Sequence, residues 1–393
     1  MTRISCLELG RLCTFVSGGT PARDDPSFWG GTLPWITSAD IVGSAVARAR
    51  SYINDRALSA SAANVVPKGT LLLVTRTGIG KVAVAGEDLS FSQDITALLT
   101  DPKRIDTTYL AQYLRTQQAH FERASRGATI KGIAREVVEQ LVVPLPPLPE
   151  QRRIAEVLDR AETLRAQRRQ ALAQLDALAE AIFLDMFGDP VSNPKRWPKV
   201  ELGELGQVQG GLQLSAARGS LPLVVPYLRV ANVHRDRLDL TEIKRFHATP
   251  AEAERTRLEA GDVLIVEGHG NPDEIGRCAL WDGSVPGCSH QNHLIRLRPN
   301  RSTALPMFIS RFLNSAGGRR GLLSASNTTS GLNTISVSKV RSSPALLPPL
   351  AIQQSFTARL AQLSTLSSNH QRSLASLNTL FTSLQHRAFR GEL

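Results

Sequence analysis

A repeated stretch is the feature of this sequence that most limits how the chain can fold. The segment PLPPLPEQRRIAEVLD in the middle of the chain returns near the C-terminus as ALLPPLAIQQSFTARL. Pro147 and Gln151 of the first copy correspond to Pro349 and Gln353 of the second, at an offset of 202 residues. A repeat of this length indicates two duplicated domains rather than a stack of short units, because each copy is large enough to bury its own core.

A second match marks the front of each copy. LELGRL at 7–12 corresponds to VELGEL at 200–205, at an offset of 193 residues. Between this match and the prolines, short apolar runs such as LLLV and VLIV alternate with clusters of Gly, Pro, Asn and Asp, a pattern typical of strands joined by turns. The stretches TYLAQYLRTQQAHFERA and LPMFISRFLNSA are amphipathic and predict helices. Each copy is therefore expected to be an α+β domain.

Each proline run is followed by a long helical pattern in which apolar residues recur with a four-three spacing and no Gly or Pro intervenes. The pattern has the same polar gap in both copies, at Arg165 and Arg168 in the first and at Ser367 and His370 in the second. Such a seam requires a helical partner, so we expect the two copies to pair. The residues expected to form the helix pair are Ile154, Leu158, Leu172, Leu175, Ile182, Phe356, Leu360, Leu363, Leu374, Leu377 and Leu384.

The prolines suit the start of a helix because proline has no N–H to leave unpaired in the first turn, where the Glu150 carboxylate also meets the positive helix end. We expect the prolines to separate each helix from its domain, so that the helices can pair with each other. At 1.5 Å per residue each helix is roughly 50 Å long. The predicted fold is two duplicated α+β domains joined by a pair of long antiparallel coiled-coil helices. Its expected parts are a first domain at 1–145, a central helix at 146–189, a second domain at 190–346 and a C-terminal helix at 347–393.

The composition narrows the partners and the compartment. Lys and Arg number 46 against 35 Asp and Glu, a net charge of +11 that favours binding to polyanions such as DNA or RNA. No apolar run approaches the length of a membrane helix, and no leader-like segment opens the chain. Four cysteines in 393 residues are typical of a protein in the reducing cytoplasm.

The combination of PLPPLPEQRRIAEVLD, AIFLDMFGDP, RWPKVELGEL and the ending LQHRAFRGEL, in the order domain, helix, domain, helix, resembles the DNA sequence-specificity subunit of type I restriction-modification systems. The resemblance covers essentially the whole chain. It implies a protein without catalysis of its own, in which two target-recognition domains each read one half of an asymmetric bipartite DNA site. The paired helices would set the gap between the two halves.

The same resemblance implies the partners. These are double-stranded DNA, two DNA methyltransferase subunits that bind S-adenosylmethionine, and motor-nuclease restriction subunits, which act together in phage defence. The chain itself would hold no cofactor and no metal. One departure concerns docking, since the second junction has Ala351 and Ile352 where the first has Pro149 and Glu150, and it lacks the Arg-Arg pair. Docking at the two junctions is therefore expected to be unequal.

Candidate DNA-contacting residues lie at predicted strand ends and turns of both copies. Arg can pair with guanine and Asn or Gln with adenine, whereas Lys mainly contacts phosphate. Polar residues in turns also serve as ordinary solvated or capping groups, so the prediction is stronger for the loops than for single residues. The candidates are Ser38, Arg76, Thr77, Lys81, Gln93 and Lys131 in the first copy, and Arg229, Asn232, His269, Asn271, His290, Gln291, Asn292 and Asn333 in the second.

Other classes of function have weaker support. TGIGKV lacks the first glycine of the Walker phosphate loop. Asp239, Glu242 and Lys244 in DLTEIK imitate the carboxylate cluster of a metal-dependent nuclease, but such a triple arises readily in a charged turn. Cysteines and histidines at 278–293 could be assembled as zinc ligands, although no CxxC knuckle is present. The chain also lacks an NPPY-type or glycine-rich methyltransferase signature, and a coiled-coil scaffold without affinity for DNA remains the non-enzymatic alternative.

Overall fold

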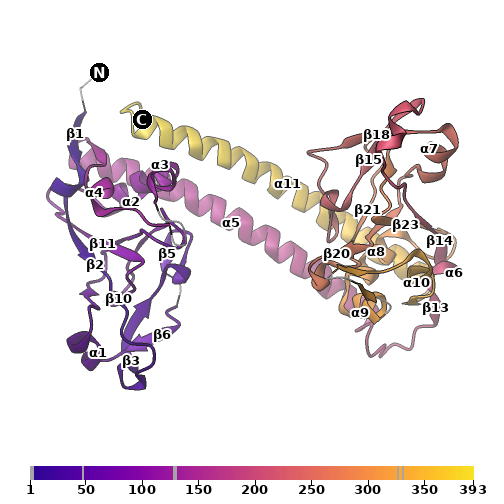
Figure 1. The fold of residues 1–393 in the computed structure, drawn as a ribbon, viewed down its shortest axis with the longest axis horizontal. Coiled ribbons are helices and arrows are strands. Elements are labelled where there is room, and N and C mark those ends of the chain that lie inside the picture. The colour runs from indigo at the N-terminus through magenta and orange to yellow at the C-terminus, as the bar shows by residue number, and fades with distance from the viewer. Residues whose placement is uncertain (1–3, 47, 127–130, 325–326, 330–331) are drawn as a thin grey trace. The chain divides into compact units, whose positions relative to one another are not determined.

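The computed structural model describes residues 4–46, 48–126, 131–324, 327–329 and 332–393. The chain divides into two compact units (Figure 1). The first unit comprises Met1–Gln170 together with Gln371–Leu393, and the second comprises Ala171–His370. Each of the two long helices is therefore shared between the units. Within the described ranges, no helix combines the length and the apolar character that crossing a membrane requires.

The first unit is built around a six-stranded sheet with the strand order β2-β11-β8-β9-β5-β4. All four residues of β8, LLLV, are buried because this strand has neighbours on both sides and apolar contacts on both faces. The strands of this sheet are β2 (Cys13–Ser17), β4 (Ile41–Val42), β5 (Ala45–Val46), β8 (Leu71–Val74), β9 (Val82–Val84) and β11 (Ile95–Thr100).

A smaller sheet with the order β6-β3-β10-β7 and a two-stranded ribbon of β1 and β12 complete the strands of this unit. In Figure 1, helices α2, α3 and α4 lie together beside the start of α5. The remaining strands are β1 (Ser5–Glu8), β3 (Trp29–Ile36), β6 (Ser51–Ile53), β7 (Val65–Val66), β10 (Leu89–Phe91) and β12 (Val142–Leu145). The helices are α1 (Asp55–Ala60), α2 (Thr107–Thr116), α3 (Gln118–Ala124) and α4 (Arg135–Glu139), with 3₁₀ turns η1 (Leu9–Arg11), η2 (Pro26–Phe28) and η3 (Ser38–Asp40).

The second unit has the same succession of paired strands. Its main sheet has the order β14-β23-β19-β21, which corresponds to β2-β11-β8-β9, and β13 pairs with β26 as β1 pairs with β12. Its strands are β13 (Lys199–Glu201), β14 (Gly206–Gly210), β15 (Leu223–Leu228), β16 (Val233–His234), β17 (Arg237–Leu238), β18 (Lys244–Ala248), β19 (Val263–Val266), β20 (Gly268–His269), β21 (Cys278–Leu280), β22 (Ser289–His290), β23 (Leu294–Pro299), β24 (Asn327–Thr329), β25 (Leu332–Thr334) and β26 (Pro344–Leu346). Its helices are α6 (Leu202–Leu205), α7 (Pro250–Thr256), α8 (Pro306–Asn314), α9 (Ala316–Ser324) and α10 (Val337–Arg341), with 3₁₀ turns η4 (Ala216–Ser220), η5 (Val230–Asn232) and η6 (Pro272–Glu274).

The two long helices are α5 (Leu148–Phe187) and α11 (Leu350–Ala388). Both begin next to the prolines, as the sequence predicts. Every residue predicted to form the helix pair is buried or half-buried, as are the four polar residues in the gap of the pattern. In the first unit, the Arg165 guanidinium lies 4.3 Å from the Phe381 ring centre and donates to Asn378 Oδ1 at 2.7 Å. A guanidinium therefore fills the polar gap of the seam by combining ring contact with hydrogen bonds.

Contacts within each unit give the local direction of the helices. In the first unit, Arg153 near the start of α5 donates to the carbonyl of Leu393, whereas Arg165, further along α5, contacts the earlier residue Asn378. In the second unit, the end of α5 reaches the start of α11, where the Phe187 and Phe356 ring centres are 5.1 Å apart. In the first unit, the helices therefore run in opposite directions, and in the second unit the end of α5 packs on the start of α11.

The expectation that prolines separate each helix from its domain is wrong. Ile154 and Leu158 are buried in one hydrophobic core with Tyr109 and Leu114 of the first unit. Gln151 next to the prolines is also buried and bonded into that unit. The helix starts are parts of the domain cores because their first turns carry apolar side chains facing the domain, and the prolines only mark where the helix begins.

Candidate nucleic-acid interface

Three loops of the first unit are held together by backbone hydrogen bonds, and we call them the first loop edge (75–81, 92–94, and 126 with 131–133). The Thr75 N–H donates to the Asp94 carbonyl at 2.8 Å, and the Ile133 N–H donates to the Thr75 carbonyl at 3.0 Å. Arg126 and Gly132 exchange two hydrogen bonds of 2.9 Å. Segments far apart in the sequence thus meet at one edge.

The loop edge depends locally on glycine. Gly78 and Gly80 have φ values of +103° and +83°, which side-chain-bearing residues rarely adopt, so the turn after β8 needs them. They are therefore turn residues. The turn presents Arg76 and Thr77, while the neighbouring loops present Gln93 and Lys131, and all four side chains are exposed. Together with Lys81, which also lies on this edge, the structure therefore brings together five of the six residues predicted in the first copy.

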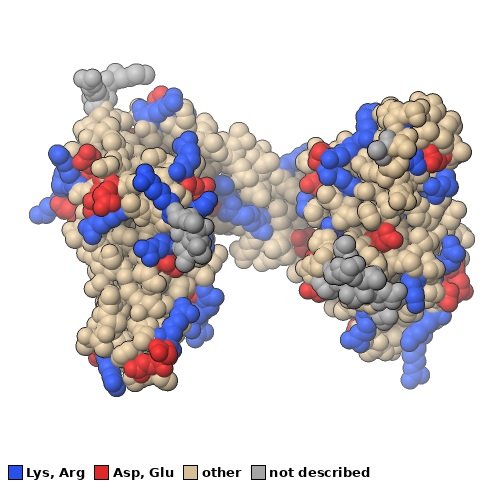
Figure 2. Space-filling model, in the orientation of Figure 1, with Lys and Arg blue, Asp and Glu red and all other residues tan. Residues whose placement is uncertain are grey.

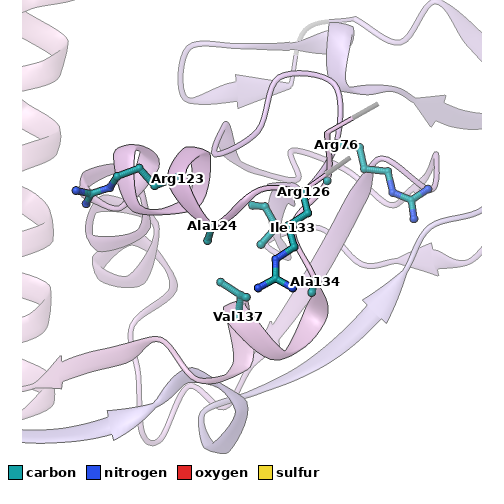
Figure 3. A pocket seen from close by; sticks show the side chains of 8 residues that line it. Arg76, Arg123, Ala124, Arg126, Ile133, Ala134 and Val137 are labelled. Atoms are coloured by element: carbon teal, nitrogen blue, oxygen red, sulfur yellow. The ribbon is translucent and has the colours of Figure 1, made fainter. Parts of the chain in front are cut away.

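A cavity of about 600 Å³ opens at this edge, lined by Arg76, Arg123 and Arg126 and floored by small and apolar residues such as Ile133 and Val137. Figure 3 shows the Arg126 side chain crossing the cavity, whereas Arg76 and Arg123 extend away from it on opposite sides. Among the described residues, the lining includes no Asp or Glu. The cavity is therefore positively charged and open to an anionic ligand.

The second unit has a corresponding second loop edge (267–271, 291–293 and 332–335). The Glu267 N–H donates to the His293 carbonyl at 3.0 Å, and the Ile335 N–H donates to the Glu267 carbonyl at 2.8 Å. His269 pairs with Asn333 across β20 and β25. The predicted residues His269, Asn271, Gln291, Asn292 and Asn333 all lie on this edge.

One acidic group belongs to the second loop edge. Burial raises the pKa of the Glu267 carboxyl above its ordinary value, and His293, whose Nδ1 lies 3.6 Å from the carboxylate, opposes this shift. The edge therefore combines amides and imidazoles with one half-buried carboxyl group. Amides and neutral imidazoles both donate and accept hydrogen bonds, as reading of base edges requires.

Three predicted DNA-contacting residues are buried, and for them the prediction is wrong. Ser38 and Asn232 are 4% and 3% exposed, and His290 is fully buried. The Asn232 side chain accepts from the Arg229 N–H at 3.0 Å and donates to the Asp239 and Glu242 carbonyls. Ser38 and Asn232 belong to the 3₁₀ turns η3 and η5, and His290 is the last residue of β22, and all three side chains are buried.

Burial changes the protonation of His290. Its Nδ1 lies 3.1 Å from the Thr256 carbonyl, which accepts the hydrogen bond. Burial, helped by the nearby Arg296 charge, lowers the pKa of His290 to about 4. The imidazole is therefore neutral at physiological pH and acts as a structural group of the second unit.

Two other predicted residues have partners inside the protein. Lys81 Nζ donates to the carbonyls of Ser38 and Ile41 at 3.2 and 3.3 Å, although its side chain remains exposed at the first loop edge. Arg229 forms an ion pair with Glu242, and its side chain is only 25% exposed. Both residues would have to exchange internal partners to contact DNA.

The metal-dependent alternatives have no geometric support in the described ranges. Glu242 of DLTEIK is engaged with Arg229 and Lys244 rather than with a second carboxylate. Cys278 and Cys288 are buried, and burial raises the pKa of the Cys288 thiol to about 12. No group of three potential metal ligands occurs among the residues that the structure describes.

Sequence reasoning missed Arg126 and a second cavity. Arg126 directly precedes the segment GATIKG, which contains the predicted residue Lys131, so its position in the sequence could have indicated it. The second cavity, of about 460 Å³, is lined by aromatic and charged residues, including Arg23, Arg50, Trp29 and Trp35. The two indole rings meet edge to face, with their ring centres 5.2 Å apart.

Figure 2 shows Lys and Arg side chains spread over the visible face of each unit and interspersed with Asp and Glu.

Comparisons with known proteins agree with this architecture. Residues 6–175 match the family model of the type I restriction modification DNA specificity domain. The type I restriction enzyme EcoKI specificity subunit of Escherichia coli (strain K12) is 28% identical over 323 residues, covering 75% of this chain and 68% of that protein. The StySPI specificity subunit of Salmonella potsdam is 26% identical over 314 residues, covering 75% and 67%.

Two solved structures share the fold. The S subunit of a type I restriction-modification system from M. genitalium has a TM-score of 0.61 at 15% identity, covering 99% of this chain and 97% of that chain. A structure from work on complex assembly and conformational transition of the type I R-M system has a TM-score of 0.58 at 17% identity, covering 100% and 99%.

By these matches the chain is similar to proteins named as specificity subunits of type I restriction enzymes. The similarity to the type I restriction modification DNA specificity domain extends over residues 6–175, less than half of the chain.

Proposed function

We propose that the two units arose by duplication and that each reads one half of an asymmetric bipartite DNA site. One observation carries this proposal: the same backbone hydrogen bonds build a loop edge in both units, while the side chains presented there differ. Thr75 and Glu267 occupy equivalent places, each accepting from the N–H of an isoleucine, Ile133 or Ile335. A shared scaffold with different side chains predicts two different half-sites.

We propose further that α5 and α11 form an antiparallel coiled coil that sets the gap between the half-sites. The burial of the seam positions, the opposed helix directions within the first unit and the contact between the end of α5 and the start of α11 in the second unit support this pairing. A continuous helix is a stiff element whose length is fixed at 1.5 Å per residue. The number of residues in the helices would thus determine how many base pairs separate the half-sites.

The partners follow from this role. A recognition subunit without a catalytic site needs methyltransferase subunits, two in the symmetric case, which bind S-adenosylmethionine themselves, and motor-nuclease subunits for cleavage. The exposed outer faces of the long helices include Leu164, Leu178 and Leu366, which are more than 40% exposed and available for docking. The chain would act in the cytoplasm, where its DNA target and these subunits meet.

Exchanging one unit tests whether each unit separately determines one half of the DNA site. Residues 1–143 are replaced by the corresponding domain of another specificity subunit, and the chimera is expressed with its methyltransferase in cells whose methylome is then sequenced. One half of the methylated site should change, while the other half and the gap between them are retained.

A matched chimera with residues 190–346 exchanged serves as the control and should change the other half only. If either chimera still methylated the original full site, the proposal that each unit reads one half-site would be wrong. A purified chain that cut DNA with magnesium, and lost this activity on Glu242→Ala, would favour the nuclease alternative instead.

A further inference from the structure

The two loop edges share a backbone but differ in charge. The described residues of the first loop edge include four basic side chains and one acidic side chain, Asp94. The second loop edge has neither Lys nor Arg and carries one acidic residue, Glu267. Because equivalent segments are compared, the difference belongs to the recognition surface and not to the general basicity of the chain.

The basic side chains of the first loop edge surround Gly132. Arg126 bonds to Gly132 through the backbone, and Lys131 is its chain neighbour. The stem of Arg76 lies over Gly132, with its Cγ 3.3 Å from where a Cβ would stand. Arg76, Arg126 and Lys131, which we call the cationic cluster, are all exposed.

The charges of the cationic cluster are not neutralised within the described part of the protein. No ion pair between described residues includes any of the three side chains. The cavity beside them has an apolar floor, so Arg126 has room to turn toward a ligand without breaking an internal contact (Figure 3). Unpaired guanidinium and ammonium groups grouped in this way match the spacing and charge of backbone phosphates.

Arginines near the second loop edge are instead held by internal acceptors. Arg277 forms an ion pair with Glu274 at 2.6 Å, and Arg319 donates to the Asp273 carbonyl at 2.9 Å. Arg235 donates to the same carbonyl. The other side chains at that edge are the imidazole of His269 and the amides of Asn271, Gln291 and Asn292. His269 Nδ1 and Asn271 Oδ1 accept backbone N–H groups of the same loop at 3.0 Å, which leaves their other polar atoms for a ligand.

We propose that the cationic cluster is a phosphate-binding site that anchors the DNA backbone at the first unit, whereas the second unit reads bases through amide and imidazole side chains, without Lys or Arg, and contributes little electrostatic affinity. The proposal rests on the proposed DNA-recognition function. It predicts that the two units differ in how strongly their DNA contacts depend on salt concentration, as well as in sequence preference. Phosphate contacts release counterions and depend on salt, whereas contacts of neutral groups to base edges do not.

The salt dependence of binding tests this assignment. The full chain is titrated with a mixed-sequence duplex between roughly 50 and 200 mM salt, and the slope of log K against log salt concentration is measured. The triple variant R76A/R126A/K131A should reduce the magnitude of the slope by about 2–3, since each lost phosphate contact removes about 0.9. The double variant H269A/N271A at the second loop edge should leave the slope unchanged.

Two control variants distinguish the loss of a local phosphate-binding site from a general loss of positive charge. R11A/R169A/R257A removes the same number of positive charges from exposed arginines that are paired with Glu8, Glu162 and Glu254. This variant should keep most of the wild-type slope. R76K/R126K retains the charge and should also preserve it. All substituted side chains are exposed or half-exposed, and thermal unfolding confirms that each variant is folded.

Each outcome has a distinct meaning. Absence of duplex binding by the wild-type chain, alone and with its methyltransferase, would end the proposed function itself. Binding with an unchanged slope in the triple variant, an equal loss in the paired-arginine control, or an equal loss in H269A/N271A would overturn the phosphate-anchor assignment and leave the proposed function standing.

Discussion

The side-chain oxygen of Gln151 accepts a hydrogen bond from the backbone N–H of Asp106 at 2.8 Å. The Gln151 amide also donates to the carbonyls of Arg104 and Pro146 at 3.2 and 2.9 Å. One buried amide thus ties the start of α5 to the loop before α2. In the second unit, Gln353 bonds to Leu305, Thr303 and Pro348 with nearly identical distances.

Replacing this amide should weaken the unit that it joins. Gln151→Leu leaves a buried N–H and two carbonyls without their partner, so the free energy of unfolding should fall by about 2–3 kcal/mol. Urea unfolding monitored by circular dichroism measures the change. Arg152→Ala at the exposed neighbouring position is the control and should stay within about 0.5 kcal/mol of wild type. Equal stability of Gln151→Leu and wild type would show that the Gln151 amide does not stabilise the first unit by joining α5 to the loop before α2.

Phe356 should be a principal stabilising residue of the second unit. It is fully buried, and its ring centre lies 5.8 Å from that of Phe183 and 5.1 Å from that of Phe187. Phe356→Ala should lower the free energy of unfolding by about 3–5 kcal/mol through lost contacts and a residual cavity. Leu366→Ala on the same helix, at a side chain that is 44% exposed, should cost far less. Similar losses for the two variants would contradict the packing described here.

The stability of the second unit should depend on pH through His290. Its pKa is about 4 in the folded protein against 6.5 ordinarily, so between these values the unfolded chain binds more protons. The stabilising contribution is complete above pH 6.5 and is lost as the pH falls toward 4, by up to about 3 kcal/mol. His290→Asn should be less stable at neutral pH but show a shallower decline between pH 7 and 5, measured by urea titrations at several pH values. An unaltered pH profile would mean that other groups control it.

A matched insertion tests the proposed role of the helices as a ruler. Seven residues inserted after Ala171 and seven after Ser373 preserve the heptad pattern and lengthen each helix by about 10 Å. The gap between half-sites should grow by about three base pairs, because each base pair rises 3.4 Å. Methylome sequencing reads the gap directly. An insertion in α5 alone would break the register and should abolish methylation, whereas an unchanged gap in the double insertion would show that the helices do not set it.

The sequence predicted the parts of this protein that depend on local periodicity. The heptad spacing gave the seam positions of α5 and α11, including the polar gap at Arg165. The proline junctions predicted the helix starts, and the apolar runs predicted central strands such as Leu71–Val74. These features follow from repeats within one segment, so they are visible without knowledge of distant contacts.

The tertiary structure decided which residues meet and which way they face. Arg76, Asp94 and Gly132 are far apart in the chain and become neighbours only through backbone hydrogen bonds between loops. Ser38 and His290 have the same polar character as exposed candidates, yet they face the core because the direction of a side chain at a strand end depends on the packing around it. The charge difference between the two loop edges likewise emerges only when equivalent loops are aligned in space. Local pattern therefore specified the elements, and long-range packing decided which side chains meet at the loop edges.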